Sequence, residues 1–302
     1  MELIFRDCYF EYAGQYSGDY NLVMMYVENS YEKFNSGGQY EVSTSALPAI
    51  AETLLYGLKH SEKPLEFSVE IINPDRNIPF EQMQKIKNWL FGQDGWKKLT
   101  LKSPEYYGYY LKCLLIPDED ITDAMGYRGI RCTLKNVSAY WYGEDKTITY
   151  TKENLTELAG EKGEKLTEAG NIWVKLNIDS QSPCRIYPLI KFKSPESYSG
   201  ATDNYMNLRI YNNYETDSES CISTGLDPKY ASKDYFINTK YALFKRDNEV
   251  YPYEPFNTSC PLLYFHNGEN EISINLKNEQ GNFSPFEYIS FTYTPMYRIG
   301  GF

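Results

Sequence analysis

Histidine is nearly absent from this chain, because only His60 and His266 occur among its 302 residues. Histidine is the side chain most used for acid–base catalysis and metal binding near neutral pH, so the shortage excludes most sites of those kinds. Neither histidine has a second histidine or a cysteine at metal-ligand spacing. We expect both to lie in turns or at strand ends. A Cys–His pair brought together by the fold stays open, although no nucleophile signature supports it.

Paired cysteines and long apolar runs are also missing. The six cysteines are Cys8, Cys113, Cys132, Cys184, Cys221 and Cys260. They form no CxxC pair, which excludes zinc-ribbon and thioredoxin-type sites, and we expect reduced thiols in a protein made in the cytosol. No apolar run approaches the roughly 20 residues of a membrane helix, and the first residues lack the pattern of a signal peptide.

Positive charge is in deficit. Lysine and arginine number 30 against 41 aspartates and glutamates, so the net charge is −11. Proteins that bind nucleic acids or anionic membranes without specificity carry an excess of basic residues, so neither partner is expected. With 42% hydrophobic and 24% charged residues the composition is globular, and the length predicts two domains that need no metal or disulfide to fold.

Strand patterns fill most of the chain. Apolar and polar residues alternate in the segments Leu65–Ile71, Lys98–Lys102, Ile130–Lys135, Val174–Ile178, Ile272–Leu276 and Ile289–Tyr293. Such alternation buries one face of each strand, which is typical of antiparallel sheets. The chain is therefore expected to be mostly β.

One helix is predicted in the first half, over residues 79–91. Its apolar stripe consists of Phe80, Met83, Ile86 and Leu90. Pro79 suits the first turn and Gly92 the end of the helix. The segment Ser45–Leu58 fits a weaker helix or a strand and loop equally well.

A change of composition divides the chain. Residues 151–170 are charged, contain three glycines and lack aromatic residues. This pattern predicts a linker or exposed excursion between a first domain, residues 1–150, and a second domain, residues 171–302. The second domain shows strand and turn signals without a helix, which favours a β-sandwich.

Few segments suggest chemistry. Asp118–Asp123 holds four carboxylates in six residues, which fits a calcium site or, better, a solvated acidic loop, since the spacing is not that of an EF-hand. Gly37–Gly38 and Gly300–Gly301 lack the phosphate-binding patterns. No motif pairs two carboxylates for glycoside hydrolysis. We therefore expect no enzyme, no catalytic or metal-binding residue and no cofactor.

The marked excess is aromatic, with 30 Tyr, 15 Phe and 4 Trp. Tyrosine suits half-buried strand faces and subunit contacts. The runs Tyr106–Tyr110 and Tyr140–Tyr142 could also stack on sugars, whereas the net acidity disfavours nucleic-acid bases. Binding or assembly is favoured, and no particular binding residue is assigned.

The order of several motifs resembles a known family. The segments are Cys8–Leu22, Leu65–Glu70, Ile86–Gly92, Trp96–Leu99, Tyr109–Tyr110, Gly129–Tyr142, Ile186–Pro188, Asn207–Asn212 and Pro261–Ile272. Together they are similar to the distal tail protein of long-tailed phages with non-contractile tails. Residues 35–60 and 143–170 do not match, and the arginine-rich patch associated with the family's first domain is thin here.

The resemblance implies an N-terminal β-sandwich with one helix and a projecting hairpin, followed by a galectin-like C-terminal β-sandwich. Six copies would close into a ring joining the tail tube to the tail tip or baseplate, and the second domain would hold tail-tip or receptor-binding proteins. DNA would pass through the lumen without specific binding. The expected location is the virion tail tip, after assembly in the bacterial host cytoplasm. Alternatives are a carbohydrate-binding module for a host surface glycan and a wall-degrading hydrolase.

Overall fold

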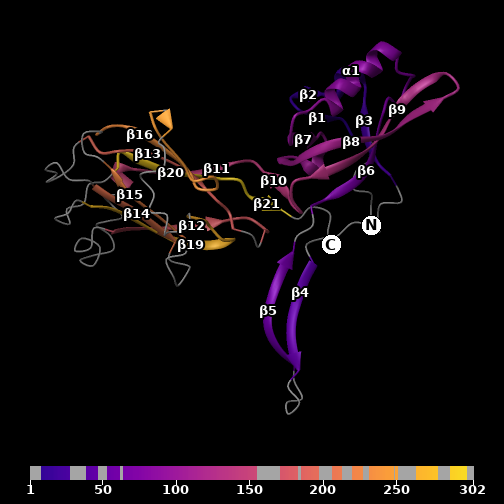
Figure 1. The fold of residues 1–302 in the computed structure, drawn as a ribbon. Helices are drawn as coiled ribbons and strands as arrows, with labels where there is room; N and C mark the ends of the chain where they lie inside the picture. The colour runs from indigo at the N-terminus through magenta and orange to yellow at the C-terminus, as the bar shows by residue number, and fades with distance from the viewer. Residues whose placement is uncertain are drawn as a thin grey trace. The chain divides into compact units, whose positions relative to one another are not determined.

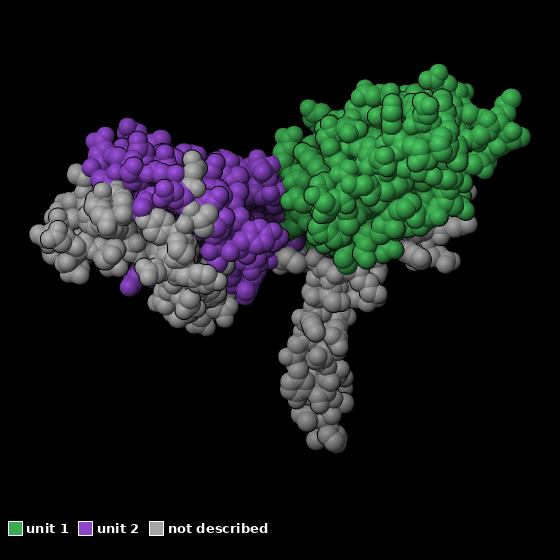
Figure 2. All heavy atoms as spheres, turned by 45° about the horizontal axis from the view of Figure 1, so that its top comes forward, with its two compact units in different colours: residues 1–144, 296–302 green, residues 145–295 purple. Residues whose placement is uncertain are grey.

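The computed structural model describes residues 8–27, 39–46, 53–61, 64–154, 171–182, 185–196, 206–212, 220–226, 231–247, 249–250, 263–277 and 286–297. Two compact units divide the chain (Figure 2). Unit 1 comprises residues 1–144 and 296–302, and unit 2 comprises residues 145–295. Antiparallel strands dominate both units, so the prediction of a mostly β fold is confirmed.

The described residues of unit 1 form one α-helix and eleven strands. They are β1 (Phe10–Tyr12), β2 (Gln15–Tyr16), β3 (Val23–Tyr26), β4 (Gln39–Ala46), β5 (Thr53–Ser61), β6 (Glu66–Ile72), α1 (Phe80–Phe91), β7 (Lys97–Leu101), β8 (Tyr109–Asp123), β9 (Gly126–Asn136), β10 (Trp141–Gly143) and β21 (Met296–Tyr297), with 3-10 turns over Ser17–Tyr20 and Pro104–Tyr106. The main sheet runs β2-β1-β7-β8-β9-β6-β3, and β10 pairs with both β8 and β21 (Figure 1).

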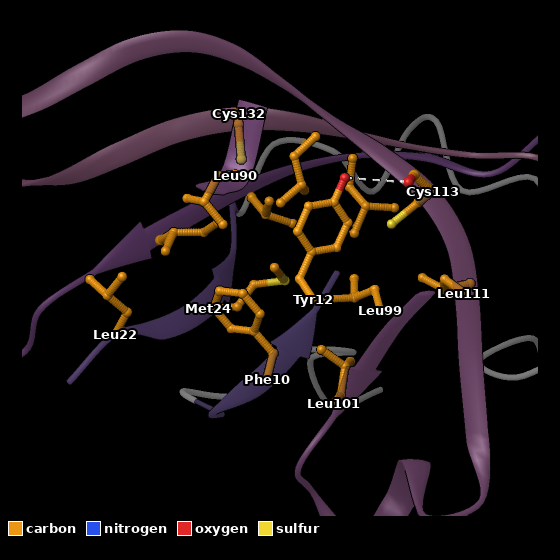
Figure 3. Close-up of a cluster of buried hydrophobic side chains, with 14 of the residues drawn as sticks. Phe10, Tyr12, Leu22, Met24, Leu90, Leu99, Leu101, Leu111, Cys113 and Cys132 are labelled. Atoms are coloured by element: carbon orange, nitrogen blue, oxygen red, sulfur yellow. Dashed lines mark hydrogen bonds between the residues drawn. The ribbon is translucent and has the colours of Figure 1, made fainter. Parts of the chain in front are cut away.

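The main sheet of unit 1 curls until its two ends meet. Just before β1, the backbone N–H of Met24 on β3 donates to the Cys8 carbonyl at 2.9 Å, and the Cys8 N–H donates back at 3.3 Å. Opposite parts of the sheet therefore enclose one core, in which Phe10, Tyr12 and Leu99 are fully buried (Figure 3). Burial of such large side chains is the main favourable term in folding.

Helix α1 lies where the sequence predicts it. The carbonyl of Pro79 accepts the first helical hydrogen bond, from Met83 N–H at 2.9 Å, and the Gly92 N–H donates to the Asn88 carbonyl at 3.0 Å at the other end. Its buried residues are Met83, Ile86, Trp89 and Leu90. The predicted stripe is wrong at its first position, because Phe80 is 62% exposed. Trp89 instead completes the buried face.

A separate hairpin occupies residues 39–61. Strands β4 and β5 pair with each other in antiparallel register and with no other described strand. The helical alternative for Ser45–Leu58 is therefore wrong where the structure describes these residues. Gly57 disfavours a helix, and the β-branched Val42, Thr44 and Thr53 favour extended backbone.

Unit 2 contains two antiparallel sheets. The six-stranded sheet runs β11 (Lys146–Thr151), β20 (Tyr288–Tyr293), β13 (Leu189–Lys193), β16 (Asp234–Asn238), β17 (Leu243–Arg246) and β18 (Glu249–Val250). The four-stranded sheet runs β12 (Asn171–Ile178), β19 (Gly268–Lys277), β14 (Met206–Asn212) and β15 (Cys221–Leu226). Alternate residues are buried on both sheets, such as Ile190 and Phe192 on β13 and Ile272 and Ile274 on β19. This is the packing of a β-sandwich.

The chain crosses between the units twice, and the crossings differ from the predicted ranges. Strand β11 pairs with β20 and so lies in unit 2, whereas β21 pairs with β10 and so lies in unit 1. Strand pairing, which local composition does not reveal, sets these boundaries. The predicted linker 151–170 begins at the last residue of β11, residues 152–154 are helical, and residues 155–170 lie outside the described residues.

Candidate interaction surfaces

The two aromatic runs singled out in the sequence meet in unit 1. Because β10 pairs with the start of β8, Tyr142 lies directly opposite Tyr110. Their rings stack with centroids 5.5 Å apart, and Tyr106 stacks on Trp141 with centroids 5.0 Å apart. Tyr106 and Trp141 are buried. Packing within the unit therefore accounts for much of the local aromatic excess, and these buried rings are not an open sugar platform.

A groove of about 820 Å³ lies beside this cluster, on the outward face of β7 and the turn before β8. We call it the lysine–tyrosine groove. Its lining includes Lys98, Tyr107, Tyr110 and Glu144. The Lys98 ammonium lies 4.4 Å from the centroid of the Tyr110 ring, a cation–π distance. Tyr107 is 87% exposed. The groove thus offers aromatic surface next to charges of both signs.

Charges of both signs line this groove, because Glu11 and Glu144 accompany Lys98 and Lys102. The Lys112 ammonium lies 4.7 Å from the centroid of the Tyr142 ring. Lys102, which lines the groove, pairs with Glu11 at 2.9 Å across β7 and β1. The exposed Tyr107 ring is of the kind enriched in protein-contact surfaces, although lysine is depleted in them.

Strands β8 and β9 form a long hairpin, and its outer part extends past the last pair that β9 makes with β6, Gly129 with Ile72. We call residues 116–130 the β8–β9 arm. Its outer half is exposed, with Met125 at the turn 87% exposed. The turn needs Gly126, whose φ of +133° is costly for a residue with a side chain. An exposed methionine at the end of a two-stranded arm is a conspicuous apolar feature.

The acidic segment Asp118–Asp123 lies in β8 and in this arm, so the prediction of a loop is wrong. Cross-strand partners on β9 explain the difference. Arg131 pairs with Glu119 across the strands and also donates from Nε to Glu70 at 3.0 Å. The hydrogen bond to Glu70 raises the pKa of Arg131. Arg131 is therefore the positive partner of both Glu70 and Glu119.

The other carboxylates of the segment point to different partners. Asp118 accepts from Thr133 Oγ1 at 3.0 Å, and Asp120 pairs with Lys87 of α1 at 2.7 Å. Asp123 accepts the Met125 backbone N–H at 2.7 Å, which is the chief reason that its pKa is lowered. Among the described residues, no group of three or more His, Cys, Asp or Glu side chains could hold a metal ion.

A second groove, of about 520 Å³, lies on the outward face of the six-stranded sheet of unit 2. Register places Phe236 of β16 directly between Lys191 of β13 and Lys245 of β17. The Tyr288 hydroxyl donates to Asp234 Oδ1 at 3.2 Å at the edge of the groove. We call this the Phe236 groove. It joins an aromatic ring to charged hydrogen-bonding groups.

Neither histidine is among the described residues that line the two grooves. His60 is on β5, opposite Tyr40. His266 lies two residues before β19, where its backbone N–H donates to Asn270 Oδ1 at 2.9 Å and its ring packs edge-on against Tyr264. Its position at a turn agrees with the prediction. Gly37–Gly38 and Gly300–Gly301 lie outside the described residues.

The described cysteines are structural. Cys8, Cys113, Cys132 and Cys221 are all buried and reduced. Burial raises the pKa values of the Cys113 and Cys132 thiols, so neither is a thiolate near neutral pH. Reactive nucleophiles usually have lowered pKa values, so these two thiols do not fit that role.

The first part of the chain is similar to a known protein family. Residues 5–138 match the family model described as a phage tail protein N-terminal domain. The match spans the main sheet, α1 and the β8–β9 arm. The resemblance to phage tail proteins inferred from the order of motifs is thereby confirmed. No curated protein matches the chain by sequence.

Solved structures are similar to nearly the whole chain. The Dit (gp19.1) protein of phage SPP1 is similar at 10% identity with a TM-score of 0.58. That protein is described as a paradigm of the hub adsorption apparatus in phages infecting Gram-positive bacteria. The alignment covers 97% of this chain and 100% of that protein. A chain of the phage P2 baseplate in its activated conformation with Ca is similar at 11% identity, a TM-score of 0.50, and coverage of 97% and 99%.

At these identities the likeness is one of fold. The similarity includes both units, because 97% of the chain aligns with the SPP1 protein. The chain accordingly shares its β-rich fold with these hub and baseplate proteins. No described helix is long and apolar enough to cross a membrane.

Proposed function

We propose that this tail protein forms a ring, which joins the tail tube to the tail tip or baseplate and holds receptor-binding proteins. The observation that carries the proposal is the full-length alignment with the SPP1 hub protein, in which neither chain has a sizeable unmatched part. Unit 1 builds the ring in this proposal, and unit 2, as a galectin-like sandwich, carries the attached proteins. The protein acts by assembly rather than by catalysis.

Exposed strand edges and charge support the same function. Strand β2 ends the main sheet of unit 1 on one side, and β15 and β18 end the sheets of unit 2. Unpaired edges favour pairing with other chains unless they are covered; in this proposal the ring covers the edge of unit 1, and attached proteins cover those of unit 2. The net charge of −11 suits a conduit through which DNA passes without specific binding. In this proposal the subunits assemble in the host cytoplasm and function at the virion tail tip.

Light scattering coupled to size-exclusion chromatography tests the ring. A hexamer has a mass of about 211 kDa, six times the 35.2 kDa of one chain. We expect this mass for the purified protein or for the protein mixed with its tail-tube partner. A monomer under both conditions would contradict the proposal. Electron microscopy of the tail tip provides the second readout, because the same subunit must form a ring there.

A glycan-binding role for unit 2 is the second candidate, and the Phe236 groove favours it. Sugars bind where an aromatic ring lies beside charged or amide hydrogen-bonding groups, and Phe236, Lys191 and Asp234 supply both. A glycan array with the full-length protein tests this role. Binding that Phe236→Ala abolishes, and Tyr241→Ala on the exposed surface preserves, would support it; no binding to any surface glycan would exclude it.

A further inference from the structure

A turn of unit 2 carries the only Asn–Gly pair of the sequence, Asn267–Gly268. The pair lies where β19 begins, and the Asn267 side chain is exposed. Asparagine loses ammonia most readily when glycine follows it, because no side chain then hinders attack by the next backbone nitrogen. Asn177 of the neighbouring strand β12 is exposed as well, but the β-branched Ile178 follows it.

The fold requires glycine at the second position of this pair. The φ of Gly268 is +89°, which is strained for any residue that carries a side chain. A Cβ atom added there would meet no heavy atom within 4 Å, so the space beside this glycine is open. The backbone geometry that selects glycine therefore also leaves the Asn267 side chain open to attack.

Hydrogen bonds hold the backbone on both sides of Asn267. The Asn270 Nδ2 donates to the carbonyl of His266 at 2.8 Å and to that of Gly268 at 3.0 Å. The Asn270 side chain is buried, and its Oδ1 accepts the His266 N–H at 2.9 Å. The Asn267 side chain and the Gly268 nitrogen are thus kept in one tight turn, which lowers the entropy cost of bringing them together.

A backbone donor contacts the oxygen of the Asn267 amide. The N–H of Ser180, just after β12, donates to Asn267 Oδ1 at 3.1 Å, and Ser180 is 2% exposed. When a nitrogen adds to an amide carbon, the amide oxygen becomes an oxyanion. A fixed N–H donor stabilises such a charge, most of all where water is excluded. The Ser180 N–H is therefore placed to assist attack on the Asn267 amide.

From these observations we infer that Asn267 is a self-modification site, which the folded protein converts into aspartate and isoaspartate with the Ser180 N–H as oxyanion donor. The Gly268 nitrogen gives its proton to hydroxide and bonds to Cγ of Asn267. The Cγ–Nδ2 bond then breaks, and the nitrogen takes a proton from water and leaves as ammonia. Water opens the resulting succinimide ring at Cγ, which yields aspartate, or at the Asn267 main-chain carbonyl, which yields isoaspartate. The net reaction consumes water and releases ammonia, without oxidation or reduction.

The two products affect the end of the β12–β19 ladder differently. Ile178 and Gly268 form the terminal pair of this ladder. Aspartate adds a negative charge and keeps the backbone, so its carboxylate can still accept the Ser180 N–H. Isoaspartate routes the backbone through the side chain and lengthens it by a methylene group, so we expect that terminal pair to be lost. The conversion alters unit 2 with time, needs no enzyme and does not depend on the proposed ring.

Incubation of the purified full-length protein in mildly alkaline buffer made with heavy-oxygen water tests the site. Ring opening in this buffer places a heavy oxygen at residue 267, so the peptide that contains it gains about 3 Da, against about 1 Da for conversion during digestion in ordinary water. We expect the gain of about 3 Da at Asn267 and no gain at Asn177, measured by peptide mapping with mass spectrometry.

The unfolded chain provides the deciding comparison. Denaturant removes the contacts of Ser180 and Asn270 and leaves the sequence unchanged, so we expect the folded protein to convert faster than the unfolded chain. A folded protein that converts no faster overturns the inference, because the hydrogen bond from Ser180 then does not assist the reaction. Asn267→Gln is the matched control, since it keeps an amide but needs a larger ring. We expect no heavy oxygen at its residue 267, and incorporation there would contradict the ring mechanism.

Discussion

Removal of the Trp89 side chain should weaken unit 1 strongly. Trp89 is 5% exposed, and its ring stacks on Phe10 at 5.8 Å and lies 5.7 Å from the Tyr20 ring. Its Nε1–H donates to the Tyr12 carbonyl at 2.8 Å, which ties α1 to β1. Replacement of a buried tryptophan by alanine typically costs about 3–5 kcal/mol, from lost transfer free energy and the cavity left behind.

A milder change separates packing from the hydrogen bond. Trp89→Phe retains an aromatic ring but leaves the Tyr12 carbonyl without this donor, so we expect it to cost about 1–3 kcal/mol. Trp96→Ala is the matched control, because Trp96 belongs to the same unit and is 46% exposed. Its expected cost is below about 1 kcal/mol, as for most surface substitutions.

Denaturant unfolding followed by far-UV circular dichroism measures all three variants, since that signal does not depend on tryptophan. The expected order of destabilisation is Trp89→Ala, then Trp89→Phe, then Trp96→Ala. We expect the two compact units to unfold in separate transitions, and the transition of unit 2 should then not move. A Trp89→Ala variant as stable as Trp96→Ala would refute the assignment of Trp89 as the residue that anchors the helix.

Three further outcomes are expected. Cys113 and Cys132 should resist N-ethylmaleimide at pH 8 until the protein unfolds, because both thiols are buried and their pKa values are raised; labelling of the native protein, mapped by mass spectrometry, would contradict this. Asn270→Ala should lower the free energy of unfolding of unit 2 by about 3 kcal/mol, because the fully buried Asn270 side chain forms hydrogen bonds with Asn212, His266 and Gly268. Urea unfolding measures this loss. The lowered pKa of Asp123 means that its stabilising contribution is present above the ordinary carboxyl pKa and is lost as the pH falls through the lowered value. Asp123→Asn should therefore reduce the loss of stability between pH 7 and pH 3, which thermal unfolding at both values checks.

The sequence predicted regular elements well where one period dominates. The alternating segments Leu65–Ile71 and Ile289–Tyr293 lie in β6 and β20, and residues 79–91 contain α1. Prediction was wrong where long-range pairing decides. The acidic segment looks like a loop until β9 supplies Arg131 across from it, and the spacing within Ser45–Leu58 suits a helix until β4 and β5 pair.

The candidate surfaces were harder to predict than the fold. Composition identified tyrosine as the informative excess, but no local pattern reveals that Tyr110 faces Tyr142 or that Lys98 covers the Tyr110 ring. Those contacts depend on residues that pair across β8 and β10 and across β7 and β8. The exposed Met125 carries no signal at all in one sequence, because exposure follows from the length of the arm relative to its sheet.

The insertion of unit 2 between β10 and β21 also orders events during translation. Trp141 and Tyr297 are neighbours in the finished sheet, yet the whole of unit 2 is made between them. The ribosome therefore delivers every strand of unit 2 before the last strand of unit 1 leaves the exit tunnel. Strand β20 of unit 2 ends at Tyr293 and β21 begins at Met296, so both units receive these strands almost together, and a chain truncated before β20 would leave both sheets incomplete.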